Sequence, residues 1–426
     1  MGCCKAVVLQ TLCSAALVLY SSTGSSEPIE LFGRLSVSAF RTQLKLSDDE
    51  SEQALLGNGQ SLRIMASHGL DAGYWSVHTT LLRFENDIPY QGGLLASPGD
   101  SPRLPDALRY RSAAGTVFDR MGAGESVQVR YEIDRAFYHH DWSQTSLSFG
   151  RQAIDFGLGR LWQPLNIFGD FSPAALDTDY KTGIDAFRAS QFFGAGGERR
   201  VVYVFGRHRR QDATAISGRH MLGATAQVLW LAAMLPGGAA YGAGVESEWR
   251  GWGWRIESSY GNAPANVRAG FWVIGMDRQF TEDLWFTFEW YRHSGGFSTV
   301  AAFENWQKQL RASSLSRASH ERISWLDTTR QGGARDQLGF AVSKSVTPLI
   351  QANWLTLAGR LRDVAFGKYR YAFAHQFSVS VSMSDNADLL FSVFSGVGKG
   401  QGYDGALGSD YGHIPLQTRV RYRHYF

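Results

Sequence analysis

Cysteine is nearly absent from this chain of 426 residues, which contains only Cys3, Cys4 and Cys13. All three lie in the first 13 residues, so the rest of the chain has no residues for a disulfide or a zinc–thiolate site. A lipoprotein anchor at Cys13 is disfavoured, because that processing signal needs a small residue where this chain has Leu12. The sequence therefore excludes a scaffold held together by disulfides.

Charge and long hydrophobic runs are also scarce. Charged residues make up 19% of the chain, and 42 basic against 39 acidic residues give a net charge of +3, too balanced for a dedicated nucleic-acid binder. A mean hydropathy of −0.21 excludes a bundle of membrane-spanning helices, since each helix needs about 20 apolar residues in a row. Glycine (47 residues) and aromatic residues (13%) are abundant, and 44% hydrophobic residues can build a large core. This composition is typical of a large β protein.

The first residues have the pattern of an export signal. Lys5 precedes an apolar stretch at 6–20, and small residues follow at 22–24. This order of a positive residue, an apolar run and a small-residue site is typical of a secretory signal peptide. We predict a signal peptide at 1–24, cleaved between positions 22 and 26, and a single domain over 27–426.

Apolar and polar side chains alternate along many segments. From Glu125 to Tyr138, Tyr369 to Met383 and Ile414 to Phe426, nearly every second residue is apolar, and most of the others are charged or carry a hydroxyl or amide. A strand places successive side chains on opposite faces, so each segment has one dry and one wet face. Strands of soluble sandwiches average ~5–6 residues, whereas these runs have the length that a tilted strand needs to cross a bilayer.

The apolar rows carry aromatic residues near their ends, as strands do at a membrane–water boundary. These residues are Trp75, Trp249, Trp254, Trp290, Trp354 and Tyr422. A large soluble barrel or a propeller is the alternative, but no repeat of roughly 40–50 residues indicates a propeller. We therefore predict an all-β fold: a transmembrane antiparallel up-and-down β-barrel of about 18 strands, with long extracellular loops and short periplasmic turns.

The strand count follows from the positions of short and long joints. Tight joints are predicted at 71–73, 139–142, 194–198, 250–251, 278–283, 346–347 and 384–386, and long joints at 42–60, 87–124, 154–182, 295–333 and 399–412. If 219–237 forms two short strands with a tight turn at Gln227–Leu229, the count is 18 and all long joints share one side. A single strand there would give 17, and a helix from Met221 to Leu235 is the other interpretation.

Several short motifs resemble those of known outer-membrane barrels. Residues 134–138 and 147–152 resemble the porin hairpin that precedes an inward-folded third loop, and 157–162 and 183–188 resemble the alginate-export-like group. The last five residues, ending in Phe426, resemble the C-terminal signal read by the barrel assembly machinery. The chain is thus similar to Gram-negative outer-membrane porin-type β-barrels. The resemblance implies location in the outer membrane of a Gram-negative bacterium, with lipid, lipopolysaccharide and the assembly machinery as partners.

A barrel of about 18 strands is wide enough for a water-filled channel. We predict passive or weakly selective passage of small hydrophilic solutes, anions among them, with an inward-folded loop at 154–182 as the constriction. Trp162, Phe168 and Phe171 would hold this loop, and Arg255, Glu257 and Glu289 are among the side chains expected to face inward. The candidate constriction and lumen residues are Arg130, Glu132, Asp134, Asp155, Arg160, Asp170, Asp177, Asp179, Lys181, Arg370, Arg419, Arg421 and Arg423.

The row formed by Arg419, Arg421 and Arg423 suggests a weak anion preference, with acidic loop residues opposing a basic wall. The alternative is that these charges pair with one another and only hydrate the lumen. We expect no enzyme activity, because no Gly-x-Ser-x-Gly nucleophile motif occurs, and no cofactor or nucleic-acid partner. We expect no metal site either, because His139 and His140 would point to opposite faces of a strand.

Two other functions stay open at this point. One is export of a polysaccharide, as the alginate-export resemblance implies. The other is a barrel that encloses a periplasmic or lumenal protein partner, such as a multihaem cytochrome in an electron conduit. Any haem would belong to that partner, since the chain has no Cys-x-x-Cys-His motif. The identity of the solute, the direction of transport and the oligomeric state do not follow from the sequence.

Overall fold

A computed structural model describes residues 28–44, 53–86, 118–120, 127–169, 173–206, 209–236, 238–263, 267–305, 333–398, 409, 411–412 and 414–426. The predicted signal peptide, Asp170 and Phe171 lie outside these ranges. Nineteen strands form one sheet, accompanied in the described ranges by a 3-10 turn at Arg209–Gln211 and a short helical segment at 300–305. The fold is therefore built almost wholly from strands.

The strands are β1 (Glu30–Leu44), β2 (Gln53–Leu70), β3 (Gly73–Asn86), β4 (Phe118–Arg120), β5 (Val127–Trp142), β6 (Thr145–Gln152), β7 (Ile184–Phe193), β8 (Gly197–Val204), β9 (Ala213–Leu222), β10 (Ala226–Leu235), β11 (Gly238–Trp249), β12 (Trp252–Ala263), β13 (Val267–Thr281), β14 (Leu284–His293), β15 (Asp336–Thr347), β16 (Ile350–Asp363), β17 (Lys368–Ser384), β18 (Ala387–Val397) and β19 (Leu416–Tyr425).

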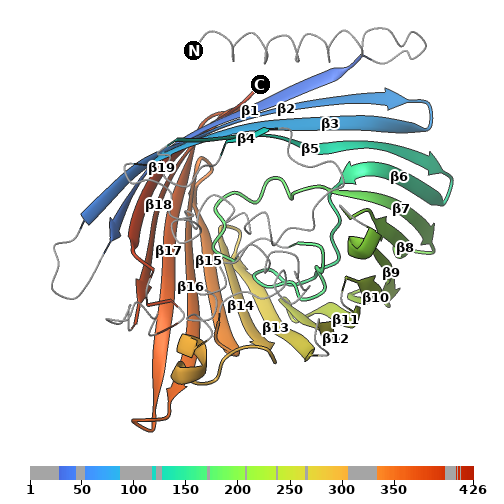
Figure 1. Ribbon diagram of the computed structural model, residues 1–426. Coiled ribbons are helices and arrows are strands. Elements are labelled where there is room, and N and C mark those ends of the chain that lie inside the picture. Colours follow the sequence, from blue (N-terminus) through green and yellow to red (C-terminus); the bar gives the residue numbers. More distant parts are fainter. Residues whose placement is uncertain are drawn as a thin grey trace.

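The sheet closes on itself because its first strand pairs with its last. Arg34 in β1 lies opposite Arg63 in β2 on one side and opposite Tyr425 in β19 on the other. The remaining wall strands pair with their neighbours in chain order, all antiparallel, with β3 beside β5 (Figure 1). Eighteen strands thus form a closed wall, and β4 is an additional short strand beside β5. This confirms the predicted fold class and strand count.

The short strand β4 occupies an edge of the wall that β6 leaves unpaired. β6 contacts only the half of β5 from Ala136 to Trp142, because the chain turns inward after Gln152. On the other half of β5, β4 pairs with Val129 to Tyr131. Backbone N–H and C=O groups on an open edge need partners, and β4 supplies some of them.

The two ends of the wall differ in the length of their joints, as predicted. One end has two- or three-residue turns, and the long joints all lie at the other end. Two predicted turns were wrong by a few residues: 139–142 belongs to β5 and 346–347 to β15, and the turns lie at 143–144 and 348–349. The apolar–polar alternation ends before these strands do, so it could not mark their ends.

Segment 219–237 contains the end of β9 and all of β10, so it belongs to two strands, but the predicted turn at Gln227–Leu229 was wrong. The turn lies at 223–225, where Gly223 adopts a φ of 68° that favours glycine. In β10, Leu229 and Leu231 face inward and are buried, while Met234 faces outward. Both faces of this strand are therefore apolar, which hides the two-residue period and explains the misplaced turn.

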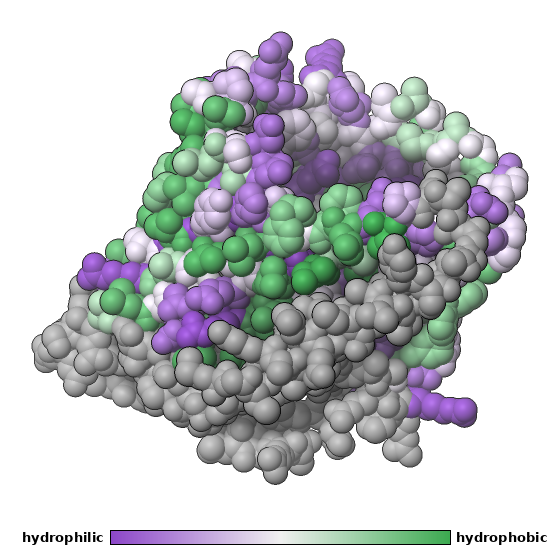
Figure 2. Space-filling model, turned by 90° about the horizontal axis from the view of Figure 1, so that it is seen from above, coloured by the Kyte–Doolittle hydropathy of each residue, from purple (hydrophilic) through white to green (hydrophobic). Residues whose placement is uncertain are grey.

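Inward and outward faces of the wall differ as predicted. In β1, Ser36 and Ser38 point inward, while Leu35 and Val37 are exposed on the outer surface. At the short-turn end, outward aromatic side chains contact one another, among them Trp252, Phe286 and Phe340. Figure 2 shows a broad band of hydrophobic residues across the face in view, with hydrophilic residues gathered towards its upper edge. An apolar belt edged by aromatic rings suits a barrel that is surrounded by lipid.

Candidate pore constriction

The segment between β6 and β7, residues 153–183, is called the inner loop here. It crosses the interior of the barrel, where Figure 1 draws it in green. Trp162 is 1% exposed, and Leu165 and Ile167 are fully buried among side chains of the inner wall. Phe168, which was expected to hold the loop, is also buried. The loop is thus a packed part of the barrel interior.

The inner face of β8 to β14 receives most of these loop side chains and is called the apolar arc. Val202, Ala215 and Leu231 are among its buried members. The ring of Trp162 stacks on Tyr291 in β14, with 5.3 Å between centroids and 10° between planes. At Gly242 in β11, an added Cβ would lie 2.3 Å from the backbone carbonyl oxygen of Ser258 in β12 and 2.5 Å from the Leu165 side chain, so this position requires glycine. The surface of the apolar arc is therefore complementary in shape to the inner loop.

Two glutamates in the apolar arc bind the backbone of the inner loop. Glu257 in β12 accepts hydrogen bonds from the N–H groups of Leu158 (2.6 Å), Gly159 (3.1 Å) and Leu165 (2.6 Å). Glu289 in β14 accepts from the N–H groups of Arg160 (2.7 Å), Leu161 (2.9 Å) and Trp162 (3.1 Å). Both carboxylates are 0% exposed. Charge-assisted bonds of this kind are roughly twice as strong as neutral ones, so this pair fixes the position of the loop.

A buried arginine compensates part of this charge. Arg255, next to Glu257 on β12 in the same inward row, forms ion pairs with Glu289 (3.2 Å) and with Asp277 in β13. Arg160 from the loop approaches Asp277 at 3.9 Å. Buried charges are costly unless they are paired, and Asp277 and Glu289 each have Arg255 as a partner.

The inner face of β19, β1, β2, β3 and β5, on the far side of the barrel, is called the basic arc. Arg419 and Arg421 project inward from β19 and are 3% and 2% exposed, and Arg423 follows them in the same row. Arg34 in β1 and Arg63 in β2 lie opposite each other in register and also face inward. The predicted row is thus one part of a larger basic surface.

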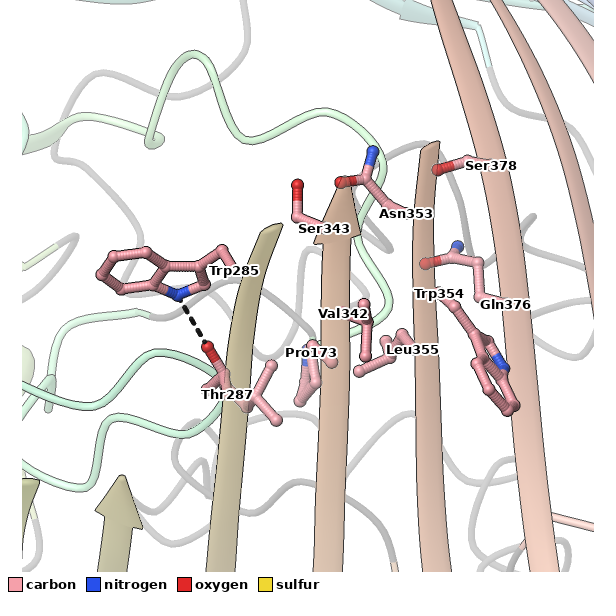
Figure 3. A pocket seen from close by; sticks show the side chains of 12 residues that line it. Pro173, Trp285, Thr287, Val342, Ser343, Asn353, Trp354, Leu355, Gln376 and Ser378 are labelled. Atoms are coloured by element: carbon pink, nitrogen blue, oxygen red, sulfur yellow. Dashed lines mark hydrogen bonds between the residues drawn. The ribbon is translucent and has the colours of Figure 1, made fainter. Parts of the chain in front are cut away.

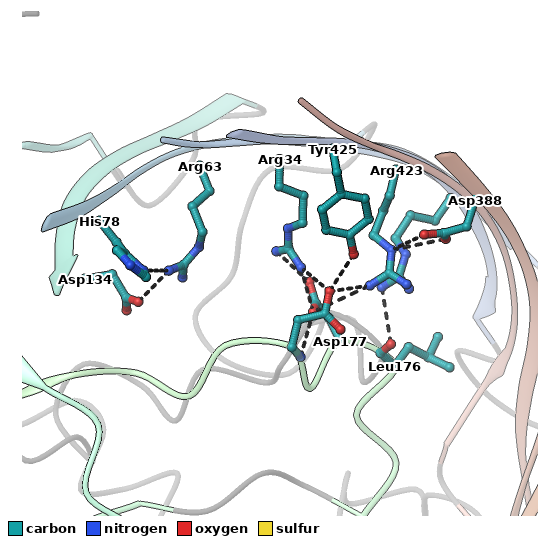
Figure 4. A network of polar contacts seen from close by, with 11 residues as sticks. Arg34, Arg63, His78, Asp134, Leu176, Asp177, Asp388, Arg423 and Tyr425 are labelled. Carbon is teal, nitrogen blue, oxygen red and sulfur yellow. Dashed lines mark hydrogen bonds and ion pairs between the residues drawn. The ribbon is translucent and has the colours of Figure 1, made fainter. Parts of the chain in front are cut away.

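Acidic residues of the inner loop bind this basic surface (Figure 4). Arg34 pairs with Asp177 and Asp179, each at 2.9 Å, and Arg423 pairs with Asp179 at 2.7 Å. The Arg421 guanidinium donates to the backbone carbonyl of Leu176 at 3.3 Å. Burial alone would raise the pKa of Asp177, but the charge of Arg34 and its hydrogen bonds outweigh burial and hold this pKa below its usual value. Both carboxylates therefore act as fixed counter-ions inside the barrel.

An aromatic ring of the inner loop lies between two arginines. The guanidinium of Arg63 is 4.2 Å from the ring centroid of Tyr180, and that of Arg34 is 5.1 Å away. Arg63 also pairs with Asp134 in β5 at 2.8 Å. Together with the ion pairs described above, these contacts hold residues 176–180 against β1, β2 and β19. Sequence reasoning missed Arg34 and Arg63, although the two-residue period of β1 would have placed Arg34 on its inward face.

The other predicted site residues take several positions. Arg130 and Glu132 are buried on the inward face of β5. Asp155 and Lys181 pair with each other at 3.1 Å, near the two ends of the inner loop. The remaining predicted wall residue, Arg370, pairs with Asp363 where β16 and β17 are joined. The structure thus brings Asp177, Asp179, Arg421 and Arg423 into one network, whereas Asp155, Lys181 and Arg370 have separate partners.

No group of three or more potential metal ligands occurs among the described residues. In the same ranges, no helix is long and apolar enough to cross a membrane.

Known structures share the fold of this chain at low sequence identity. A BenF-like porin from Pseudomonas fluorescens is 9% identical with a TM-score of 0.56, over 95% of this chain and 100% of the porin. OccAB4 from Acinetobacter baumannii is 9% identical with a TM-score of 0.55, over 94% and 99%. OpdK from Pseudomonas aeruginosa, crystallised with vanillate, is 8% identical with a TM-score of 0.53, over 93% and 98%. These likenesses support the fold of an outer-membrane porin barrel and give no specific support to the alginate-export-like group.

No family model and no curated protein matches the sequence.

Proposed function

We propose that this protein is an outer-membrane channel through which small hydrophilic solutes pass passively, with a preference for anions. The observation that carries the anion preference is the inward row of Arg419, Arg421 and Arg423, extended by Arg34 and Arg63 across the basic arc. The likeness to porin barrels supports the channel itself. A Gram-negative outer membrane is the matching location, with lipid and lipopolysaccharide around the apolar belt.

The geometry suggests how an anion would pass. The inner loop is bound to both arcs and narrows the interior, and solutes would pass beside it where arginines of the basic arc face inward. Guanidinium groups bind carboxylates through two parallel N–H···O bonds, and a row of them offers successive weak sites. Charges of one sign in a passage with low-dielectric walls raise the local concentration of the opposite ion. Conduction needs sites that bind and release, which a row of arginines provides.

The C-terminal strand fits the proposed route of assembly. Phe426 and Gly33 exchange two backbone hydrogen bonds, of 2.7 and 3.0 Å, which join the last strand to the first. The Phe426 side chain is 60% exposed. An exposed terminal aromatic residue on the closing strand suits recognition by the barrel assembly machinery before closure.

Reversal potentials in planar bilayers test this proposal. With the processed full-length barrel in a KCl gradient, we expect the potential to shift towards that of chloride. Clear cation selectivity would contradict the anion preference. Folded protein that gives no conductance would contradict the channel itself.

Polymer export and a protein-filled barrel are less well supported. Either would need the interior free for a bulky occupant. Instead, the inner loop crosses this interior and is bound to both arcs, through Glu257 and Glu289 on one side and Arg34 on the other.

A further inference from the structure

A cavity of about 150 Å³ lies against the inner wall beside the inner loop (Figure 3). Leu161 and Pro173 line it from the loop, and residues of β14, β15, β16 and β17 line it from the wall. A cavity of roughly this size holds a single six-membered ring in other proteins. The channel function proposed above does not use this cavity.

Four wall residues of the cavity form one continuous row. Trp285 lies opposite Ser343, Ser343 opposite Asn353, and Asn353 opposite Ser378, on four successive strands. Partners in register project from the same face of a sheet, here the inward one. Among the described residues, none that lines the cavity is charged. We call these four residues the neutral row.

Two polar side chains of the neutral row, Asn353 and Ser378, are available to a ligand, whereas Ser343 accepts a hydrogen bond from Gln351 at 2.8 Å. The side chains of Asn353 and Ser378 form no hydrogen bond with any residue in the described ranges, and Figure 3 shows both beside the open space. Gln376, next to Ser378 on the same inward face, uses its amide nitrogen to donate to the carbonyl of Ala174 at 2.9 Å. An unpaired amide and an unpaired hydroxyl on one wall are suited to hydroxyl groups of a solute.

Trp285 supplies an apolar surface for the same solute. Its indole N–H donates to the Thr287 hydroxyl at 3.2 Å, which fixes the ring, and the side chain remains 39% exposed. The negative face of an aromatic ring attracts the weakly positive C–H groups of a saturated ring. An indole face beside neutral hydrogen-bonding groups therefore suits a ring that carries both C–H and O–H groups.

We propose that the neutral row is a binding subsite for a hydroxylated six-membered ring of monosaccharide size. A bare aromatic ring would leave Asn353 and Ser378 without partners, and a charged group would find no counter-charge in the lining.

The subsite is continuous with the basic arc. Ser378 lies opposite Ser392 in β18, and Ser392 lies opposite Arg419 in β19. Two strand spacings separate Ser378 from Arg419, or roughly 10 Å. A solute that moves from the neutral row along the wall in this direction would next meet Arg419, so a carboxylate on its ring suits this path. This part of the inference rests on the proposed anion channel and gives its solutes a class: hydroxylated carboxylates such as sugar acids.

Solute block of single-channel current tests the subsite. The probes are D-galacturonate and cyclohexanecarboxylate, which share one negative charge and a six-membered ring but differ in hydroxyl groups, together with neutral D-glucose. We expect galacturonate to block at clearly lower concentration than cyclohexanecarboxylate, and glucose to block more weakly than galacturonate. Equal block by the two acids would overturn the subsite.

Variants separate the subsite from the channel. Trp285→Ala and Asn353→Ala should each weaken block by galacturonate and glucose roughly fivefold, the effect of one lost contact. Trp272→Ala removes an indole from the outer face of β13 and should leave block unchanged. Unchanged block in both cavity variants would contradict the proposal. If the pore is cation-selective but glucose still blocks it, the proposed anion preference is wrong and the proposed subsite still holds.

Discussion

The inner loop contacts two opposite parts of the wall in different ways. On the apolar arc, its backbone N–H groups donate to Glu257 and Glu289, and its side chains pack among buried apolar residues. On the basic arc, its side chains Asp177 and Asp179 pair with arginines. Backbone bonds to buried carboxylates hold the loop whatever solute is present, whereas the aspartates occupy guanidinium groups that a solute anion would also bind. We infer that the apolar arc positions the constriction and the basic arc selects the solute.

The largest effect on the channel is expected when the two carboxylates of the apolar arc that bind the inner loop are replaced by amides. In Glu257→Gln and Glu289→Gln, an NH₂ group replaces an acceptor oxygen and faces backbone donors, which should cost about 3 kcal/mol of loop attachment per variant. A detached loop no longer narrows the passage, so single-channel conductance and open-channel noise should both rise. The matched control is Glu282→Gln, in the exposed turn between β13 and β14. Wild-type conductance in a folded double variant would refute the positioning role.

The second-largest effect, on ion selectivity, is expected when the acidic counter-ions of the basic arc are neutralised. Asp177→Asn with Asp179→Asn removes two negative charges beside Arg34 and Arg423. Each such pair is worth about 1 kcal/mol at 4 Å in water, so the loss of both charges should raise the permeability ratio of chloride to potassium roughly 30-fold. Reversal potentials measure this ratio. A ratio that stays constant or falls would mean that the aspartates do not compete with solute anions.

A smaller effect is expected from the wall arginines themselves. Arg419→Gln with Arg421→Gln should lower the same permeability ratio roughly fivefold, because other arginines of the basic arc remain. Arg360→Gln is the control, since Arg360 lies at the exposed outer face of β16. Equal shifts in the variant and the control would show that selectivity does not arise in the basic arc.

The smallest effect is expected from pH. The pKa of Asp177 lies below its usual value, so its pairing with Arg34 contributes fully above the ordinary aspartate pKa of about 3.9. The contribution is lost only as pH falls through the lowered pKa, that is, below this value. The share of the anion selectivity that depends on Asp177 should therefore stay constant from pH 7 to about 4 and change below it. A transition between pH 5 and 7 that Asp177→Asn abolishes would contradict the assignment.

Most of the fold could be predicted from the sequence, because the alternation of apolar and polar side chains along a strand depends only on neighbouring residues. The period of β17 and β19 follows from neighbouring residues, and the lengths of the joints fixed the number of strands at 18. The turn at 223–225 could not be placed, because the inner loop covers the inner face of β10 with apolar side chains. The period is lost wherever the inside of the barrel is as apolar as its outside.

The candidate site could be predicted only in part. The inward direction of Arg419, Glu257 and Glu289 follows from strand period, and their burial agrees with it. Their partners do not follow, since Glu257 binds Leu158 across 99 positions of the chain and Arg34 binds Asp177 across 143. Such contacts depend on how the barrel closes and how the inner loop folds within it.

The sequence by itself determined three properties of the barrel wall: which side chains face lipid, which face inward, and how many strands the chain can form. These properties depend on residues next to one another, because a strand alternates its side chains whatever it packs against. The tertiary structure alone decided which inward charges meet. Closure brings β19 beside β1 and gathers their arginines into one surface, and the inner loop then joins that surface to two glutamates on the opposite wall.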